Sequence, residues 1–168
     1  MVYKRNVDEL EWTEMGHGSR FHFQRKSLTP IKEPFAPKLG VSLYRLAPGK
    51  RSFPAHEHLA NDEAILVVRG QATLRYGDED IALDQGDYVH LPAASGKAHQ
   101  MRNTGDDVLE YYCLSSGVLP EVVLYPDSNK IAAIGPGGVD DKGERKQRVA
   151  EWFRREPVQY WDGEAPDD

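Results

Sequence analysis

The stretch that decides the fold reads Gly49-KRSFPA-His56-Glu57-His58-LAND-Glu63-AILVVR-Gly70. His56 and His58 are two residues apart in a β-type segment, so both side chains should point to one face. Glu63 stands at the head of the next apolar strand, and turn glycines bracket the two strands. Two imidazoles from one strand and a carboxylate from the next can form a pocket of ligands. The stretch therefore predicts a metal site built on neighbouring strands.

A third imidazole, from His99 at the start of another β-rich run, can close this set. Neutral imidazole is a good donor to divalent transition metals, and one carboxylate offsets part of the ion's charge. We therefore predict that His56, His58, Glu63 and His99 bind Fe, Mn, Ni, Co or Zn, among which the sequence does not choose. Such a set leaves coordination positions open for substrate, water or dioxygen. Glu63 is a ligand first, and a carboxylate that dissociates could also serve as the catalytic base.

The simpler reading of each residue is that it is structural. A lone histidine is more often a surface or core residue than a ligand, and Glu63 could be an ordinary charge at a strand end. The fixed order and spacing of the set favour the metal site. His17, His22 and His90 lack such context, and we predict no ligand role for them.

Outside this stretch the chain alternates short β-rich runs with turn residues from Leu39 to Ile134, at the spacing typical of a sandwich or barrel. We expect one domain over residues 1–168, with an irregular arm at 1–38, a barrel at 39–135 and a tail at 136–168. The arm carries Pro30, Pro34 and Pro37 and a possible helical stretch at 7–15. In the tail, the spacing of Val149, Trp152 and Phe153 predicts a helix over 144–156, and 158–161 could add an edge strand. Three tryptophans, Trp12, Trp152 and Trp161, are expected to pack on the barrel.

Composition excludes several classes of protein. The chain has 168 residues, a net charge of −6 and one cysteine, Cys113. One cysteine cannot form an internal disulfide or an all-cysteine metal cluster. The acidic balance argues against nucleic acid as a partner, and no apolar run is long enough to span a membrane. With no signal peptide visible at the start, we expect a cytoplasmic protein.

The spacing of the ligands resembles the first signature of the cupin superfamily, Gly, five residues, His-x-His, three or four, Glu, six, Gly. The second signature, Gly, five, Pro-x-Gly, two, His, three, Asn, is matched by Gly86-DYVHL-Pro92-AAS-Gly96-KA-His99-QMR-Asn103. This chain departs from the family in one extra residue before His56 and two extra residues between Pro92 and Gly96. The longer turn could shift the approach of His99. The resemblance implies a small jelly-roll β-barrel with the metal inside, and cupins commonly pair, so we expect a homodimer.

Side-chain parity along the strands predicts the walls of the cavity. Met101 shares a face with His99, and Ile65 and Val67 share a face with Glu63. If the strand over 108–115 buries Val108, then Tyr112 also points inward. We therefore predict that Met101 and Tyr112 contact a small-molecule ligand, and a register slip of one residue would reverse the assignment.

Three functions are compatible with this site. The chain is similar to compact bacterial cupins described as sugar-phosphate-isomerase-like, which implies a metal-dependent isomerase acting on a sugar or sugar phosphate. A cupin dioxygenase is the second possibility, since it also needs a metal with open coordination positions. A cupin that only binds a small ligand or a metal is the third possibility. A phosphorylated substrate would need a basic cluster, for which Arg45, Arg51 and Arg102 are the candidates.

Overall fold

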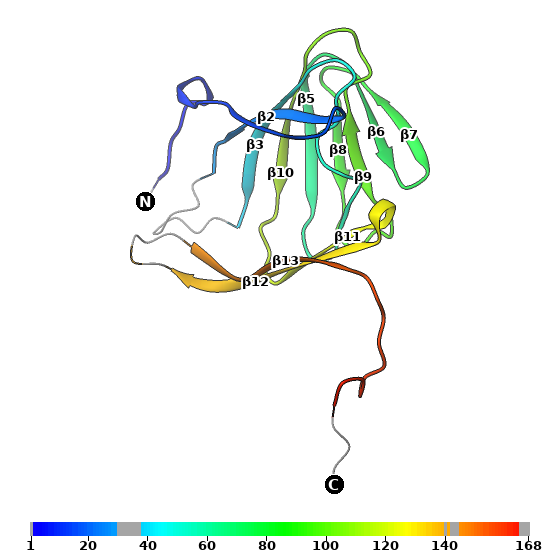
Figure 1. The fold of residues 1–168 in the computed structure, drawn as a ribbon. Coiled ribbons are helices and arrows are strands. Elements are labelled where there is room, and N and C mark those ends of the chain that lie inside the picture. Colours follow the sequence, from blue (N-terminus) through cyan, green and yellow to red (C-terminus); the bar gives the residue numbers. More distant parts are fainter. Residues whose placement is uncertain (1, 30–37, 140, 142–144, 165–168) are drawn as a thin grey trace.

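The structure is a computed structural model that describes residues 2–29, 38–139, 141 and 145–164 (Figure 1). These residues form an all-β jelly roll with two short 3-10 helices. In chain order the elements are η1 (Val7–Glu9), β1 (Thr13–His17), β2 (Phe21–Ser27), β3 (Gly40–Leu46), β4 (Glu57–His58), β5 (Glu63–Arg69), β6 (Ala72–Tyr76), β7 (Glu79–Leu83), β8 (Tyr88–Leu91), β9 (His99–Arg102), β10 (Leu109–Ser115), β11 (Glu121–Tyr125), η2 (Pro126–Ser128), β12 (Lys130–Val139) and β13 (Arg145–Arg154).

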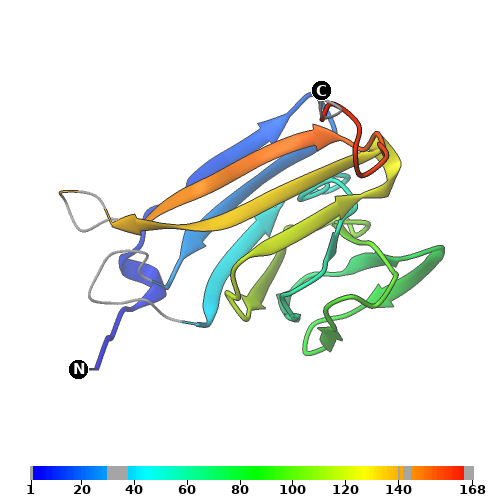
Figure 2. The ribbon, with the colours of Figure 1, turned by 90° about the horizontal axis from the view of Figure 1, so that it is seen from below.

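The described strands form three antiparallel sheets. The largest has six strands in the order β1-β2-β3-β10-β5-β8, the second runs β13-β12-β11-β4, and the third runs β7-β6-β9. An isolated bridge between His56 and His99 joins the second sheet to the third. The β12–β13 hairpin lies below the lower ends of β3, β10 and β5 in Figure 1, and in the view from below it lies in front of the six-stranded sheet (Figure 2).

Alternation along the strands builds the core between these sheets. In β5, Ile65 and Val67 are buried while Leu66 between them is 36% exposed, as expected for a strand with one buried face. Leu74 of β6, Leu109 of β10 and Phe23 of β2 meet them in one hydrophobic cluster. Because Glu63 has the parity of Ile65 and Val67, the same alternation turns its carboxylate inward.

The N-terminal arm is more regular than the sequence suggested. Instead of an irregular segment with a helix at 7–15, it forms η1 and a β1–β2 hairpin whose second strand pairs with β3. Phe23 explains the difference, because β2 places this ring in the core, where it contacts Tyr44 and Phe53. Pro30, Pro34 and Pro37 lie outside the described residues.

The helix expected over 144–156 is wrong. Residues 145–154 form β13, which pairs with β12 so that Ile131 lies opposite Phe153 and Ala132 opposite Trp152. The free edge of β12 offers a row of backbone groups to this segment, and such pairing overrides a weak helical periodicity. Residues 158–161, expected as an edge strand, are in no strand.

The tryptophans also differ from expectation. Trp152 is 57% exposed and Trp161 is 73% exposed, so neither packs on the barrel as predicted. Trp12 is partly buried, with the Lys26 ammonium 4.8 Å and the Arg45 guanidinium 4.1 Å from its ring centre. Among the described residues, no helix has the length and apolar character needed to cross a membrane.

Candidate metal centre

The backbone brings the two ligand-bearing segments together. The His56 N–H donates to the His99 carbonyl at 3.1 Å, and the His99 N–H donates to the His56 carbonyl at 2.8 Å. His58 lies two residues after His56, in β4, where it pairs with Val123 of β11. Glu63 begins β5 between Ser115 of β10 and Leu91 of β8. Each ligand is thus fixed by strand pairing.

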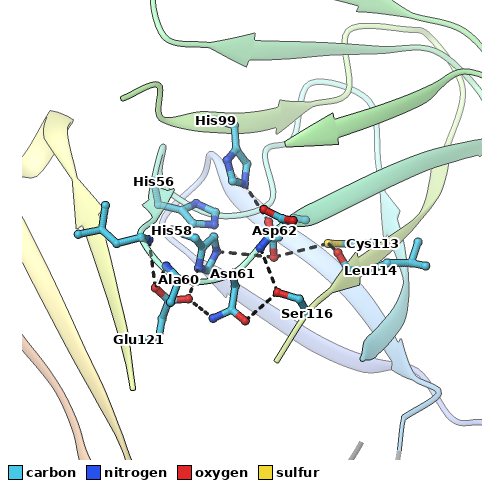
Figure 3. A network of polar contacts seen from close by, with 12 residues as sticks. His56, His58, Ala60, Asn61, Asp62, His99, Cys113, Leu114, Ser116 and Glu121 are labelled. Atoms are coloured by element: carbon cyan, nitrogen blue, oxygen red, sulfur yellow. Dashed lines mark hydrogen bonds and ion pairs between the residues drawn. The ribbon is translucent and has the colours of Figure 1, made fainter. Parts of the chain in front are cut away.

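The four predicted ligands converge. One potential ligand atom from each of His56, His58, Glu63 and His99 lies within 4.8 Å of the other three. The His99 Nε2 is 3.0 Å from Glu63 Oε2, and the His58 Nε2 is 3.6 Å from Glu63 Oε1. The ring centres of His56 and His99 are 4.4 Å apart. Figure 3 shows the three imidazoles side by side.

These residues fit a divalent transition metal. Ligand atoms about 2.1 Å from an ion lie roughly 3 Å apart when adjacent and roughly 4.2 Å apart when opposite. The observed separations need only a small contraction to reach these values. Nitrogen and carboxylate donors without a thiolate suit Fe, Mn, Co, Ni or Zn.

The longer turn between Pro92 and Gly96 does not displace His99, because the turn is tied to β4 and its loop. The Ala94 N–H donates to the His58 carbonyl at 2.8 Å, and the Gly96 N–H donates to the Glu57 carboxylate at 2.6 Å. Both residues have positive φ, 52° for Ala94 and 75° for Gly96. The two extra residues therefore fold over the segment that carries His58 and leave the His56–His99 pairing intact.

Two of the ligands have protonation states suited to metal binding. Burial, together with the charge of His99, lowers the pKa of His56 to about 4, so its imidazole is neutral at neutral pH. The His56 Nδ1–H donates to the Pro54 carbonyl at 2.8 Å, which leaves the Nε2 lone pair free. Burial alone would raise the pKa of Glu63. The hydrogen bond from His99 and the charges of His58 and His99 outweigh burial and lower that pKa to about 2.

A cavity of about 50 Å³ adjoins the ligands. Its lining is mostly neutral: Tyr44, Ser52, Phe53, His56, Glu63, Ile65, His99, Gln100, Met101, Tyr111 and Cys113. Met101 lies in this wall, as parity predicted. Burial raises the pKa of Tyr44 to about 12 and raises those of Tyr111 and Cys113 well above their ordinary values. These hydroxyl and thiol groups therefore keep their protons near neutral pH.

The expected place of Tyr112 in the cavity is wrong. Strand β10 turns Leu109, Tyr111 and Cys113 toward the core, so Tyr112 lies on the opposite face. The strand begins at Leu109, one residue later than the parity argument assumed. A register irregularity between Glu110 and Tyr111 follows. A shift of one residue exchanges the two faces of a strand.

Sequence reasoning also missed two polar groups around the ligands. The Cys113 thiol is 3.8 Å from Glu63 Oε1. Glu121, at the start of β11, places its Oε2 atom 3.4 Å from the Nδ1 atom of His58. Glu121 stands 58 residues after Glu63, outside both motifs, and only its position at the head of an apolar strand set it apart in the sequence.

Comparison with known proteins agrees with this geometry. Residues 42–115 match the family model of the cupin domain, a range that contains all four candidate ligands. Over these residues the chain therefore matches the cupin domain, and its fold is of the cupin type. No curated protein matches the sequence.

Several solved structures share the fold over most of the chain. A sugar phosphate isomerase of the cupin superfamily from Silicibacter pomeroyi has 22% identity and a TM-score of 0.71, covering 94% of this chain and 98% of that one. A candidate sugar phosphate isomerase from Acidithiobacillus ferrooxidans has 21% identity and a TM-score of 0.64, covering 89% and 91%. A polyketide cyclase from Streptomyces resistomycificus has 13% identity and a TM-score of 0.57, covering 72% and 84%. At these identities the likeness concerns the fold, which hosts several chemistries.

Proposed function

We propose that this cupin is a metal-dependent enzyme that acts on a small, uncharged, oxygen-bearing molecule. The observation that carries the proposal is the convergence of three imidazoles and one carboxylate, of which His56, Glu63 and His99 line a cavity. A structural metal site is normally closed by its protein ligands, whereas a site next to a cavity leaves room for substrate.

The size of the cavity limits the part of a substrate that it can hold. A buried water needs about 10–15 Å³ measured with a water-sized probe, so 50 Å³ corresponds to about four waters. This is room for a fragment of four or five non-hydrogen atoms. The cavity thus favours a short hydroxy-carbonyl compound, or the reacting end of a longer one.

The charges around the cavity favour a neutral substrate over a phosphate ester. No lysine or arginine of the described residues lines the cavity. The three arginine candidates have other partners: Arg45 pairs with Glu110, Arg102 pairs with Asp80, and Arg51 Nη1 lies 3.4 Å from the Gln100 side-chain oxygen. A phosphate group would therefore find no free cation in this wall.

The chemistry that this arrangement supports best is isomerisation through proton transfer. A bound divalent metal would act as a Lewis acid and make a C–H bond beside a carbonyl more acidic. Glu63 is ionised and accepts a hydrogen bond from His99, so it can take a proton if its carboxylate leaves the metal. The neutral phenols of Tyr44 and Tyr111 can donate hydrogen bonds to a substrate oxygen. The apolar walls keep bulk water from the proton in transit.

Dioxygen activation is the second candidate, and the small apolar part of the cavity favours it. Phe53, Ile65 and Met101 form a wall without charge beside the ligands, and a diatomic gas needs no polar anchor. This reaction would require a redox-active metal, whereas isomerisation would also proceed with Zn.

Metal analysis followed by turnover tests the proposal. The purified protein, reconstituted at neutral pH with each of the five metals, should hold about one equivalent. Less than about a tenth of an equivalent of every metal would refute the metal site. Short aldoses and ketoses, with and without phosphate, should then be tested for C–H exchange in D₂O, and for O₂ uptake with Fe(II). Exchange supports the isomerase and O₂ uptake the dioxygenase; binding without turnover would show a binding module.

We also propose that the chain forms a homodimer in the cytoplasm. Exposed aromatic rings on β13 and the segment after it, among them Trp152 and Trp161, support pairing with a second copy. Sedimentation velocity tests the dimer.

A further inference from the structure

Glu121 is a buried carboxylate that the proposed chemistry does not use. Its side chain is only 3% exposed, although it lies outside the ligand set. Oε1 accepts hydrogen bonds from the backbone N–H groups of Leu59 and Ala60, both at 3.1 Å. The amide of Asn61 donates to Oε2. Burial of a charge is costly unless it is paired in this way, so the position of Glu121 needs a reason.

The carboxylate is held firmly on the His58 side of the site. Its partner Asn61 is itself fixed, because its Nδ2 donates to the Val118 carbonyl at 3.0 Å and its Oδ1 accepts from the Ser116 hydroxyl at 3.2 Å. Figure 3 shows Glu121, Asn61 and Ser116 as one chain of contacts beneath His58. Glu121 therefore cannot turn away without breaking several hydrogen bonds.

The two nitrogens of His58 face two different carboxylates. Nε2 is on the ligand side, 3.6 Å from Glu63 Oε1, and Nδ1 is on the opposite side, 3.4 Å from Glu121 Oε2. Nδ1 is buried and has no partner within hydrogen-bond geometry. Glu121 Oε2 is the acceptor aimed at it, a few tenths of an ångström beyond the ordinary N–H···O range.

We propose that Glu121 is a positioning residue that keeps the proton of His58 on Nδ1 and so presents the Nε2 lone pair to the metal. An ionised carboxylate only accepts hydrogen bonds, so the tautomer with Nδ1–H is the one it favours. Metal-binding histidines commonly donate their other N–H to a carboxylate or a carbonyl, which orients the ring and raises its basicity. The Pro54 carbonyl is this acceptor for the Nδ1–H of His56. For His58 the acceptor is the carboxylate of Glu121, which carries a charge.

This inference rests on the proposed metal site, but its first test does not need a metal. In the metal-free protein, ¹⁵N NMR of the histidine side chains above pH 7 should show His58 as the Nδ1–H tautomer. Glu121→Gln replaces one acceptor oxygen by an N–H donor, so the His58 signals should shift toward the Nε2–H tautomer. An Nε2–H tautomer in the unmodified protein, or no shift in the folded variant, would overturn the proposal.

The second measurement is Co(II) affinity, followed by the visible absorption of the bound ion. Glu121→Gln should weaken binding about 10- to 100-fold, the usual effect of losing such a partner. Unchanged affinity would also overturn the positioning role. If the unmodified protein binds no metal while the tautomer shift is observed, the proposed function fails and the role of Glu121 toward His58 stands.

Two control variants separate positioning from folding. Glu110→Gln makes the same charge change in the pair with Arg45 and should leave both the tautomer and the affinity unchanged. Asn61→Ala removes a partner of Glu121 but keeps the carboxylate facing His58. It should lower stability and retain the Nδ1–H tautomer. If Asn61→Ala shifts the tautomer as far as Glu121→Gln does, loop packing rather than the carboxylate determines it, which contradicts the proposal.

Discussion

The ligand end of the barrel and its C-terminal edge use their side chains in opposite ways. Around the ligands, polar groups are buried and tied to one another: Glu121 is 3% exposed, and its Oε1 accepts hydrogen bonds from the backbone N–H groups of Leu59 and Ala60, both at 3.1 Å. At the edge formed by β13, large aromatic rings are exposed. The first region is held by specific polar contacts between buried side chains, whereas the second rests mainly on the backbone pairing of β12 with β13, with an exposed hydrogen bond from Trp152 to the Tyr125 hydroxyl beside it. Substitutions should therefore have large, specific effects at one end and small effects at the other.

The largest effect should follow from removing a ligand. His99→Ala should lower metal affinity by more than about 100-fold, beyond the loss expected for a residue that only supports a ligand. His90→Ala is the matched control. His90 lies exposed on β8 outside the ligand group, so this variant should bind metal as tightly as the unmodified protein. Competition with a fluorescent chelator measures both. Equal affinities for the two variants would contradict the assigned ligand set.

Most of the ligand end could be predicted from the sequence, and little of the C-terminal edge could. The spacing of His56, His58, Glu63 and His99 encodes chemistry, and strand geometry converts that spacing directly into a shared face. In contrast, the periodicity of Trp152 and Phe153 carried no such information, because neither ring is buried enough for periodicity to specify a face. The prediction for Tyr112 is wrong for another reason: β10 begins at Leu109, where it pairs with Leu46 of β3, and the sequence of one strand does not encode its pairing partner.

The second prediction concerns the pH dependence of the metal-free protein. The pKa of His56 is about 4 in the folded state against 6.5 for the ordinary side chain. Between these values the unfolded chain binds a proton that the folded chain does not, so stability should fall as the pH decreases from about 6.5 to about 4. The loss should be of the order of 3 kcal/mol. Below pH 4.5 the depressed pKa of Glu63 continues the loss.

Urea unfolding at a series of pH values, without metal, measures this dependence. His56→Gln removes the titrating imidazole and should flatten the curve between pH 6.5 and 4. If the variant and the unmodified protein lose stability in parallel over this range, the assignment to His56 is wrong.

The third prediction concerns the buried amide of Asn103. Asn103 is 1% exposed; its Nδ2 donates to the carbonyls of Leu46 and Asp107, both at 2.9 Å, and its Oδ1 accepts from the Gly105 N–H at 3.0 Å. Asn103→Ala leaves these buried backbone groups without partners and should cost about 2 kcal/mol of unfolding free energy. Urea denaturation at pH 7 tests this value. Thr104→Ala, one residue further and exposed, is the control and should stay close to the unmodified protein.

The smallest effect on the barrel should come from the exposed rings after β13. Replacing Tyr160 and Trp161 together by serine should change the unfolding free energy of the monomer by less than about 0.5 kcal/mol, since neither ring is buried. The same variant should sediment as a monomer if these rings bury themselves in a second copy. If the variant is still fully dimeric, Tyr160 and Trp161 are not part of the dimer contact.

The reciprocal backbone pairing of His56 with His99 has a consequence for how the protein acquires its metal. The two residues are 43 positions apart, by the difference 99 − 56, so the third imidazole arrives only when distant segments have met. Contacts of this kind form late and slow the folding of β proteins. The unfolded chain thus offers only a partial, weaker set of donors, and a metal added during refolding should stabilise the folded protein without speeding its formation.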